Sequence, residues 1–197
     1  MDNTDLSIRL YSAQTAVVQN RLMEDGVCFS KRRYVIQKYE ESAPVFIAAY
    51  DWFVQEAAKI VPKPEKAEYP YWAYADLYNA DASKEELLRL QVPIDEVLLF
   101  DMYDWYKLLR LQYIGEDERE EAAFQSILKD RGIRNESDVI LTHFYPDLKR
   151  QVQSSWKNLF RHHHALKIGS PPKSIEVMAG LWQIKREWIV DPEEHQL

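Results

Sequence analysis

The stretch that decides the fold reads Leu87-Leu-Arg-Leu-Gln-Val92, Pro93-Ile-Asp-Glu96 and Val97-Leu-Leu-Phe100. Its two outer runs are short and apolar, as strands are, and the segment between them has the proline and acidic residues typical of a turn. From Asp101 onward, apolar residues at helical spacing predict a helix. Strand pairs of this kind argue against the regular alternation of a doubly wound sheet. We therefore predict an α+β fold, in which several helices pack against a small, mainly antiparallel sheet.

The N-terminal segment predicts a strand, a helix and a second strand. Ser7–Tyr11 alternates polar and apolar residues, as a half-buried strand does. Ser12 is placed to cap a helix that ends near Asp25, with Gly26 as its C-terminal stop. Val27–Phe29 then predicts a short extended piece.

The most regular helical pattern begins at Ser42 and continues to about residue 60. Pro44 lies in its first turn, where the missing N–H does no harm. Tyr69–Tyr74 is predicted to be extended, because Pro70 fixes its own φ and restricts the residue before it. The basic cluster Lys31–Arg33 is interpreted as a solvated loop.

The second half of the chain predicts further helices and a late pair of strands. After a polar break near residue 115, helical spacing predicts a helix that Gly132 ends. Residues 146–162 predict another helix, and the alternation over 174–190 favours strands over a helix. There is no repeat or convincing domain boundary, so we predict one domain, 1–197, with its last few residues disordered.

Composition and charge exclude several classes of protein. The 197 residues are 46% hydrophobic and 29% charged, an ordinary balance for a folded domain. Cys28 is the single cysteine, so no intrachain disulfide can form, and neither a signal segment nor a membrane-spanning apolar run is present. We therefore predict a cytoplasmic protein with no membrane partner. The net charge of −7 disfavours nucleic acid as a partner, and the sequence specifies no oligomeric state.

Signatures of the common enzyme classes are missing. The five glycines are scattered, and the chain has no nucleophile elbow, no His-Glu-x-x-His and no Cys-x-x-Cys. His162-His163-His164 is interpreted as a polar helix end, because consecutive helical residues point in different directions and cannot close one site. We predict no metal site, and we interpret Cys28 as a small buried hydrophobe.

Arg9, Tyr11 and Gln14 form the first candidate ligand-binding cluster. Arg9 and Tyr11 share one face of the predicted strand, and Gln14 opens the helix predicted to follow it. An inward-facing arginine needs an anion, such as a carboxylate or a ligand phosphate. The alternative is an edge strand with Arg9 in solvent or paired with an internal aspartate.

The aromatic segment Tyr69–Tyr74 supplies the second candidate. Tyr71 and Trp72 fall on opposite faces, so one face packs on the long helix while the other could stack a ligand ring. Trp105, on the helix that begins at Asp101, joins this candidate set. Core packing alone is the alternative explanation for these rings.

Asp101 and Asp104 lie three residues apart where a predicted strand leads into a helix. Asp101 is a candidate catalytic residue, because functional carboxylates often lie at strand ends. Catalysis would require a pKa moved toward neutrality. The same spacing also suits an N-cap followed by an acidic residue in the first turn, so both interpretations stay open.

Five segments of the chain resemble a known family. They are Leu10–Gln14, Tyr69–Tyr74, Val92–Leu99 with the following Asp101 and Trp105, Gln153–Phe160, and Leu181–Ile184. They resemble the bacterial family described as domain of unknown function 3841. The resemblance spans most of the chain and implies a bacterial protein of one domain. It implies no particular activity, cofactor or catalytic residue.

Two classes of function follow. The first is a small-ligand or nucleotide-binding domain, since the order of elements is similar to the plan of ADP-ribosyltransferases, which hold NAD in a split-sheet cleft. Arg9 would then hold a phosphate, and Asp101 would be the acidic residue. Tyr11 and Trp72 would stack rings, with NAD as the candidate cofactor. The second class is a non-catalytic interaction module whose exposed aromatic residues form a partner patch.

Overall fold

The computed structural model describes residues 6–81, 83, 86–172 and 174–190, and it confirms the α+β class. The disorder predicted for the last few residues falls on 191–197, outside the described residues. The strands are β1 (Ser7–Gln14), β2 (Val27–Cys28), β3 (Tyr71–Tyr74), β4 (Glu86–Pro93), β5 (Val97–Asp101), β6 (Val177–Leu181) and β7 (Ile184–Lys185).

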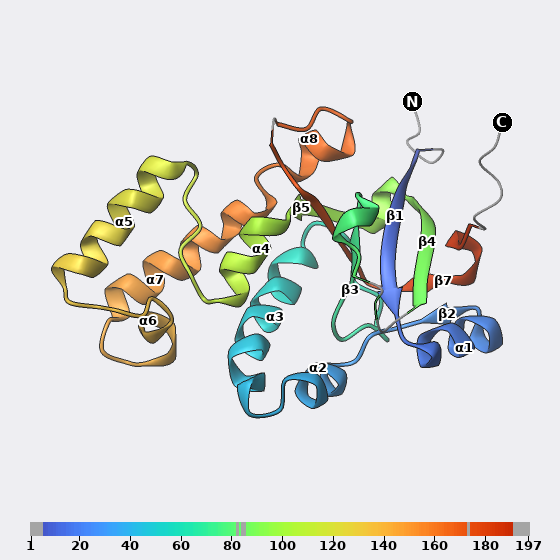
Figure 1. Ribbon diagram of the computed structural model, residues 1–197, viewed down its shortest axis with the longest axis horizontal. Coiled ribbons are helices and arrows are strands. Elements are labelled where there is room, and N and C mark those ends of the chain that lie inside the picture. The colour runs from blue at the N-terminus through green and yellow to red at the C-terminus, as the bar shows by residue number, and fades with distance from the viewer. Residues whose placement is uncertain (1–5, 82, 84–85, 173, 191–197) are drawn as a thin grey trace.

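Helices connect most of these strands, and several lie together to one side of the sheet (Figure 1). The α-helices are α1 (Ala16–Asp25), α2 (Arg32–Tyr39), α3 (Ala43–Ala57), α4 (Met102–Leu109), α5 (Glu118–Asp130), α6 (Ser137–Leu141), α7 (Pro146–Ser155) and α8 (His163–Lys167). The 3-10 helices are η2 (Glu40–Ser42), η3 (Leu77–Asn79), η4 (Ile94–Glu96), η5 (Trp156–Phe160) and η6 (Arg186–Trp188). Among the described helices, none combines the length and the apolar composition that a membrane span requires.

The main sheet is antiparallel and curled. Its strand order is β4-β1-β3-β6-β5, which makes β4 and β5 its two edges. Yet η4 alone joins these edges. The four Cα steps from Pro93 to Val97 reach at most about 15 Å, less than the roughly 19 Å across four strand spacings of a flat sheet. The sheet must therefore curl until β4 and β5 approach each other at η4.

The strands expected at Leu87–Val92 and Val97–Phe100 are present, but each pairs with a strand that the sequence did not indicate. β4 pairs with β1 from Ser7 opposite Pro93 to Gln14 opposite Glu86, and β5 pairs with β6. The two strands of the deciding stretch therefore form no hairpin, because η4 carries the chain across the end of the curl. Residues 174–190 do contain strands, but β6 lies between β3 and β5, while β7 pairs with β2.

The first strand is longer than predicted, and the first helix begins later. Ser12 lies inside β1 rather than at a helix cap, and Gln14 ends the strand rather than opening the helix. The ladder to β4 extends through Gln14, and its hydrogen bonds override the preference of serine for a cap. Gly26 ends α1 in the left-handed conformation at φ 74°, as predicted.

Two further predictions need correction. The basic cluster Lys31–Arg33 leads into α2 instead of a loop, and Glu68 accepts a hydrogen bond from the backbone N–H of Arg32 at 3.0 Å. That contact comes from a segment distant in sequence, so local reasoning did not reveal the helix start. The helix expected over 146–162 ends as α7 at Ser155 and tightens into η5. The predicted α3 and α5 are confirmed.

Two buried clusters cover the two faces of the curled sheet. The inner cluster includes Leu10, Leu90 and Leu99, with Trp188 from η6 among its members. The outer cluster joins α3 and α4 to the strands, and its large, fully buried side chains include Phe53, Phe100, Trp105 and Trp156. Gly180 allows the close approach of α3, because a Cβ there would lie 3.0 Å from Phe53 Cζ.

Candidate functional site

A gap between β1 and β3 creates the candidate site. The two strands pair where Tyr11 lies opposite Tyr74, at the end of β3. Farther along β1, the Ser12 hydroxyl donates to the carbonyl oxygen of Trp72 at 2.6 Å. The Gln14 side-chain amide donates in turn to the Ser12 hydroxyl at 2.9 Å. The Ser12 hydroxyl thus satisfies the Trp72 carbonyl at the edge of β3 where the two backbones separate, and Gln14 holds that hydroxyl in place.

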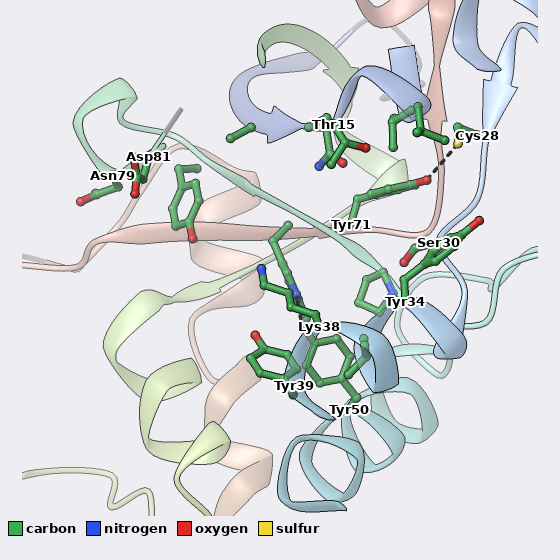
Figure 2. Close-up of a pocket in the computed structure, with 18 of the residues that line it drawn as sticks. Thr15, Cys28, Ser30, Tyr34, Lys38, Tyr39, Tyr50, Tyr71, Asn79 and Asp81 are labelled. Carbon is green, nitrogen blue, oxygen red and sulfur yellow. Dashed lines mark hydrogen bonds between the residues drawn. The ribbon is translucent and has the colours of Figure 1, made fainter. Parts of the chain in front are cut away.

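A cavity of about 910 Å³ lies at this gap, and we call it the aromatic cavity. The end of β1 and the start of α1 line one side, and the start of β3 with α2 and α3 lines the other. Figure 2 shows Asn79 and Asp81 toward one end and Cys28 toward the other. The volume lies within the roughly 300–1,000 Å³ of small-molecule sites.

Aromatic side chains dominate the lining. Six of the chain's 12 tyrosines lie there, together with Trp72. These tyrosines are Tyr34, Tyr39, Tyr50, Tyr71, Tyr74 and Tyr106. Such a lining offers ring faces for stacking and hydroxyl groups for hydrogen bonds within one space.

Core contacts hold Trp72 in a single orientation. Its indole Nε1 donates to the Tyr50 hydroxyl at 2.7 Å. The ring centroid of Trp72 lies 4.3 Å from that of Trp105 and 5.1 Å from that of Phe53. The part of Trp72 that borders the aromatic cavity is therefore preorganised, so a ligand that stacks on it immobilises little additional side chain.

Three tyrosine hydroxyls of the aromatic cavity, those of Tyr50, Tyr71 and Tyr74, are neutral near pH 7. Burial raises the pKa of Tyr74 to about 12, and the neighbouring Tyr106 adds to the shift. Burial also raises the pKa of Tyr50 and of Tyr71 above the usual range. The Tyr71 hydroxyl lies 3.0 Å from the buried Cys28 Sγ, which further favours its protonated form. These groups can therefore donate hydrogen bonds but carry no charge.

Positive charge reaches the aromatic cavity from two helices. Arg21 comes from α1 and Lys38 from α2, where the Lys38 ammonium lies 5.7 Å from the ring centroid of Tyr39. Neither Arg21 nor Lys38 forms an ion pair with another described residue. Among the described lining residues, Arg21 and Lys38 outnumber the carboxylate Asp81. The lining is therefore more positive than the chain as a whole, whose net charge is −7.

The structure brings only part of the predicted ligand-binding set together. Gln14, Tyr71 and Trp72 line the aromatic cavity. Trp105 is buried in the outer cluster behind Trp72. Arg9 and Tyr11 do share one strand face, but it is the face opposite the fully buried Leu10 and Ser12, and both side chains are half-buried. Arg9 lies opposite Gln91 on β4 and forms no ion pair within the described part of the chain.

Asp101 and Asp104 have separate roles, both outside the lining of the aromatic cavity. Asp101 caps α4, since its carboxylate accepts from the backbone N–H of Tyr103 at 2.9 Å. Asp104 is buried, and burial raises its pKa to about 6 although Arg161 and Lys107 oppose the shift. The Asp104 Oδ2 lies 2.8 Å from Arg161 Nη2, while its Oδ1 lies 3.7 Å from Lys107 Nζ. Asp104 is thus a buried carboxylate whose pKa is moved toward neutrality, whereas Asp101 is an N-cap.

The three consecutive histidines diverge at the start of α8. His163 is buried, and its Nδ1 accepts from the backbone N–H of Leu99 at 3.1 Å. Burial and the nearby Lys167 lower the pKa of His163. Within the described residues, no group of three or more His, Cys, Asp or Glu side chains is arranged to hold a metal.

Sequence reasoning did not identify the residues that α2 contributes. Tyr34 and Lys38 are four residues apart and therefore lie on one face of a helix. That spacing was the available signal, but the loop predicted for the neighbouring Lys31–Arg33 gave no reason to expect a helix there. Arg21 had no such signal, because only the docking of α1 near β3 brings it to the aromatic cavity.

The fold and the site define an α+β protein with a curled antiparallel sheet and an aromatic cavity where two of its strands separate. A family model described as domain of unknown function (DUF3841) matches residues 9–190, and the chain belongs to that family. The resemblance seen in the sequence is therefore confirmed. Neither the curated proteins nor the solved structures contain a match to the chain.

Proposed function

We propose that the protein binds a small molecule that combines a planar ring with negative charge, and that nucleotides are the ligand class. The observation that carries the proposal is the aromatic cavity, where six tyrosines and Trp72 lie with Arg21 and Lys38. Stacking of a base on an aromatic side chain contributes about 1–3 kcal/mol and tolerates any base. Cationic side chains supply charge-assisted hydrogen bonds to phosphate.

NAD belongs to this ligand class. The separation of β1 from β3 supports the split-sheet cleft of the ADP-ribosyltransferase hypothesis. Of the residues that this hypothesis assigns, Trp72 lines the aromatic cavity, whereas Asp101 caps α4. Transfer of ADP-ribose would therefore need a different acidic residue, and Asp81 is the carboxylate present among the described lining residues. The proposal accordingly concerns binding.

We place this binding in the bacterial cytoplasm, with a small molecule rather than nucleic acid or a membrane as the partner. The single cysteine suits a reducing compartment. The net charge of −7 opposes long-range attraction to polyanions, while the local charge of the aromatic cavity still suits one small anion.

A thermal-shift screen with NAD and the common nucleotides tests the proposal. A ligand at about 100 times its dissociation constant adds roughly 2.7 kcal/mol, which raises the melting temperature by roughly 5–10 °C in a chain of this size. Tyr106→Ala should weaken the shift, because Tyr106 lines the aromatic cavity. Phe144→Ala is the control, since Phe144 is an exposed aromatic residue outside the lining, whereas the Tyr103 ring lies against that of Tyr106. If no nucleotide shifts the wild-type protein at millimolar concentration, the proposal fails.

The interaction module is the alternative function, and exposed aromatic residues outside the aromatic cavity support it. Tyr78 in η3 is 93% exposed, and Phe144 between α6 and α7 is 81% exposed. Loss of a partner complex in Phe144→Ser, with no nucleotide shift in the wild-type protein, would favour this alternative.

A further inference from the structure

A second cavity, of about 460 Å³, adjoins the aromatic cavity, and we call it the basic cavity. Arg21 and Cys28 line both, so the two spaces meet at these side chains. The basic cavity differs in chemistry, because Arg21, Lys31 and Lys66 line it against the single carboxylate Asp25. The two cavities are therefore adjacent, with rings lining the aromatic cavity and three cations lining the basic cavity.

Contacts at the start of α2 hold the wall of the basic cavity in place. The Lys31 ammonium donates to the backbone carbonyl of Lys66 at 2.7 Å and lies 3.1 Å from the Glu68 carboxylate. Glu68 also accepts from the backbone N–H of Arg32. The segment that carries Lys66 is therefore tied to α2, which keeps its side chain at the basic cavity.

Two of the three cations that line the basic cavity form no ion pair with a described residue. Glu68 compensates Lys31, but neither Arg21 nor Lys66 has an ion-pair partner in the described part of the chain. Arg21 presents a planar fork of donors that matches phosphate oxygens, and Lys66 adds a point charge. Arg21 and Lys66 together outweigh Asp25, the carboxylate among the described lining residues, and this excess of positive charge at a concave site is the environment that a phosphate group prefers.

The junction between the two cavities is polar. The Tyr71 hydroxyl and the Cys28 thiol are hydrogen-bonded there at 3.0 Å, and both side chains are buried. Burial raises the pKa of Tyr71, so its hydroxyl stays protonated and carries no negative charge that would repel a phosphate.

We infer that the basic cavity is a phosphate subsite and that the ligand is a nucleotide with a diphosphate group. Its base lies among the tyrosines of the aromatic cavity, and its phosphates reach past Cys28 to Arg21 and Lys66. This inference rests on the proposed function and adds the substrate class to it.

The test compares each nucleoside with its 5′-diphosphate, for adenine, guanine, cytosine and uracil, by calorimetry on the full chain. For the base that fits, the wild-type protein should bind the diphosphate about tenfold or more tightly than the nucleoside, because charged hydrogen bonds form only with the diphosphate. Lys66→Gln should remove this advantage and leave nucleoside affinity unchanged, because Lys66 lines the basic cavity and not the aromatic cavity. Arg21→Gln, which touches both cavities, should lower the affinity for the diphosphate more than that for the nucleoside. Arg150→Gln and Lys129→Gln are matched controls, because they remove exposed cations on α7 and α5.

Each outcome separates this inference from the proposed function. If a nucleoside and its diphosphate bind wild type equally, the phosphate subsite is wrong while ring binding stands. If Arg21→Gln weakens both ligands to the same extent, Arg21 does not act on phosphate and the inference is overturned. If none of the eight compounds binds, the inference is overturned, while the thermal-shift screen that includes NAD still decides the proposed function. Competition by inorganic pyrophosphate against the diphosphate, but not against the nucleoside, would support the subsite independently.

Discussion

Replacing Asp104 with asparagine should change how the stability of the protein depends on pH. The side chain of Asp104 is 4% exposed, and burial raises its pKa to about 6, despite the opposing effect of Arg161 and Lys107. In the unfolded chain the pKa is the ordinary value of about 3.9. Between these two values the folded protein keeps a proton that the unfolded chain has lost. The free energy of unfolding therefore falls as the pH rises through this window.

The magnitude follows from the two pKa values. A difference of about 2 corresponds to roughly 3 kcal/mol, present in full below about pH 4 and lost by about pH 6 to 7. Asp104→Asn keeps the shape of the side chain but cannot ionise. The stability of wild type minus that of Asp104→Asn should thus fall by roughly 3 kcal/mol from pH 4 to pH 7.

Urea unfolding followed by tryptophan fluorescence at several pH values measures this difference. All other titrating groups are common to the two proteins, so the subtraction removes their contribution. A difference that stays constant, or that rises with pH, would refute the reasoning. A rise would mean that the ion pairs of Asp104 with Arg161 and Lys107 outweigh the loss of hydration.

Three further predictions concern other positions. Gly26→Ala should lower stability by about 1–2 kcal/mol in urea unfolding, because the left-handed backbone at φ 74° strains any residue with a Cβ; an unchanged midpoint would contradict this. Gly180→Ala should cost about 1–3 kcal/mol, because the new Cβ forces the Phe53 ring to move; a stabilised variant would show that the core has spare room. His163 should titrate below its ordinary pKa of about 6.5 in an NMR experiment, since burial and Lys167 disfavour its charged form. The unfolded chain then binds the proton more readily, so His163 contributes stability that is lost as the pH falls below about 6.5, and titration above that value would contradict the argument.

Much of the fold could be predicted from local patterns. The apolar stripe of α3, the stop at Gly26 and the alternation over 174–190 each depend on near neighbours in sequence, and each was confirmed. Strand partners could not be predicted, because pairing joins segments far apart in the chain. The same limit explains Ser12, whose place in a strand depends on the ladder that β4 provides.

The candidate site was predictable only where its signal was local. Tyr71 and Trp72 stood out because they belong to a dense aromatic segment, and both line the aromatic cavity. Arg9 also stood out, but the cations that reach the aromatic cavity are Arg21 and Lys38. In the sequence those two look like ordinary surface residues of helices. Only the docking of α1 and α2 around the start of β3 brings both side chains to the aromatic cavity.

The curl of the sheet bears on how the site could adapt to its ligand. β4 pairs with β1 along its full length, and η4 connects β4 to β5. Both edge strands of the sheet are therefore held in place, which restrains the strands that line the aromatic cavity. The opposite side includes the eight-residue helix α2, which carries half-exposed rings such as that of Tyr39. We expect the site to accommodate ligands of different size by small movements of α2, while the strands keep their positions.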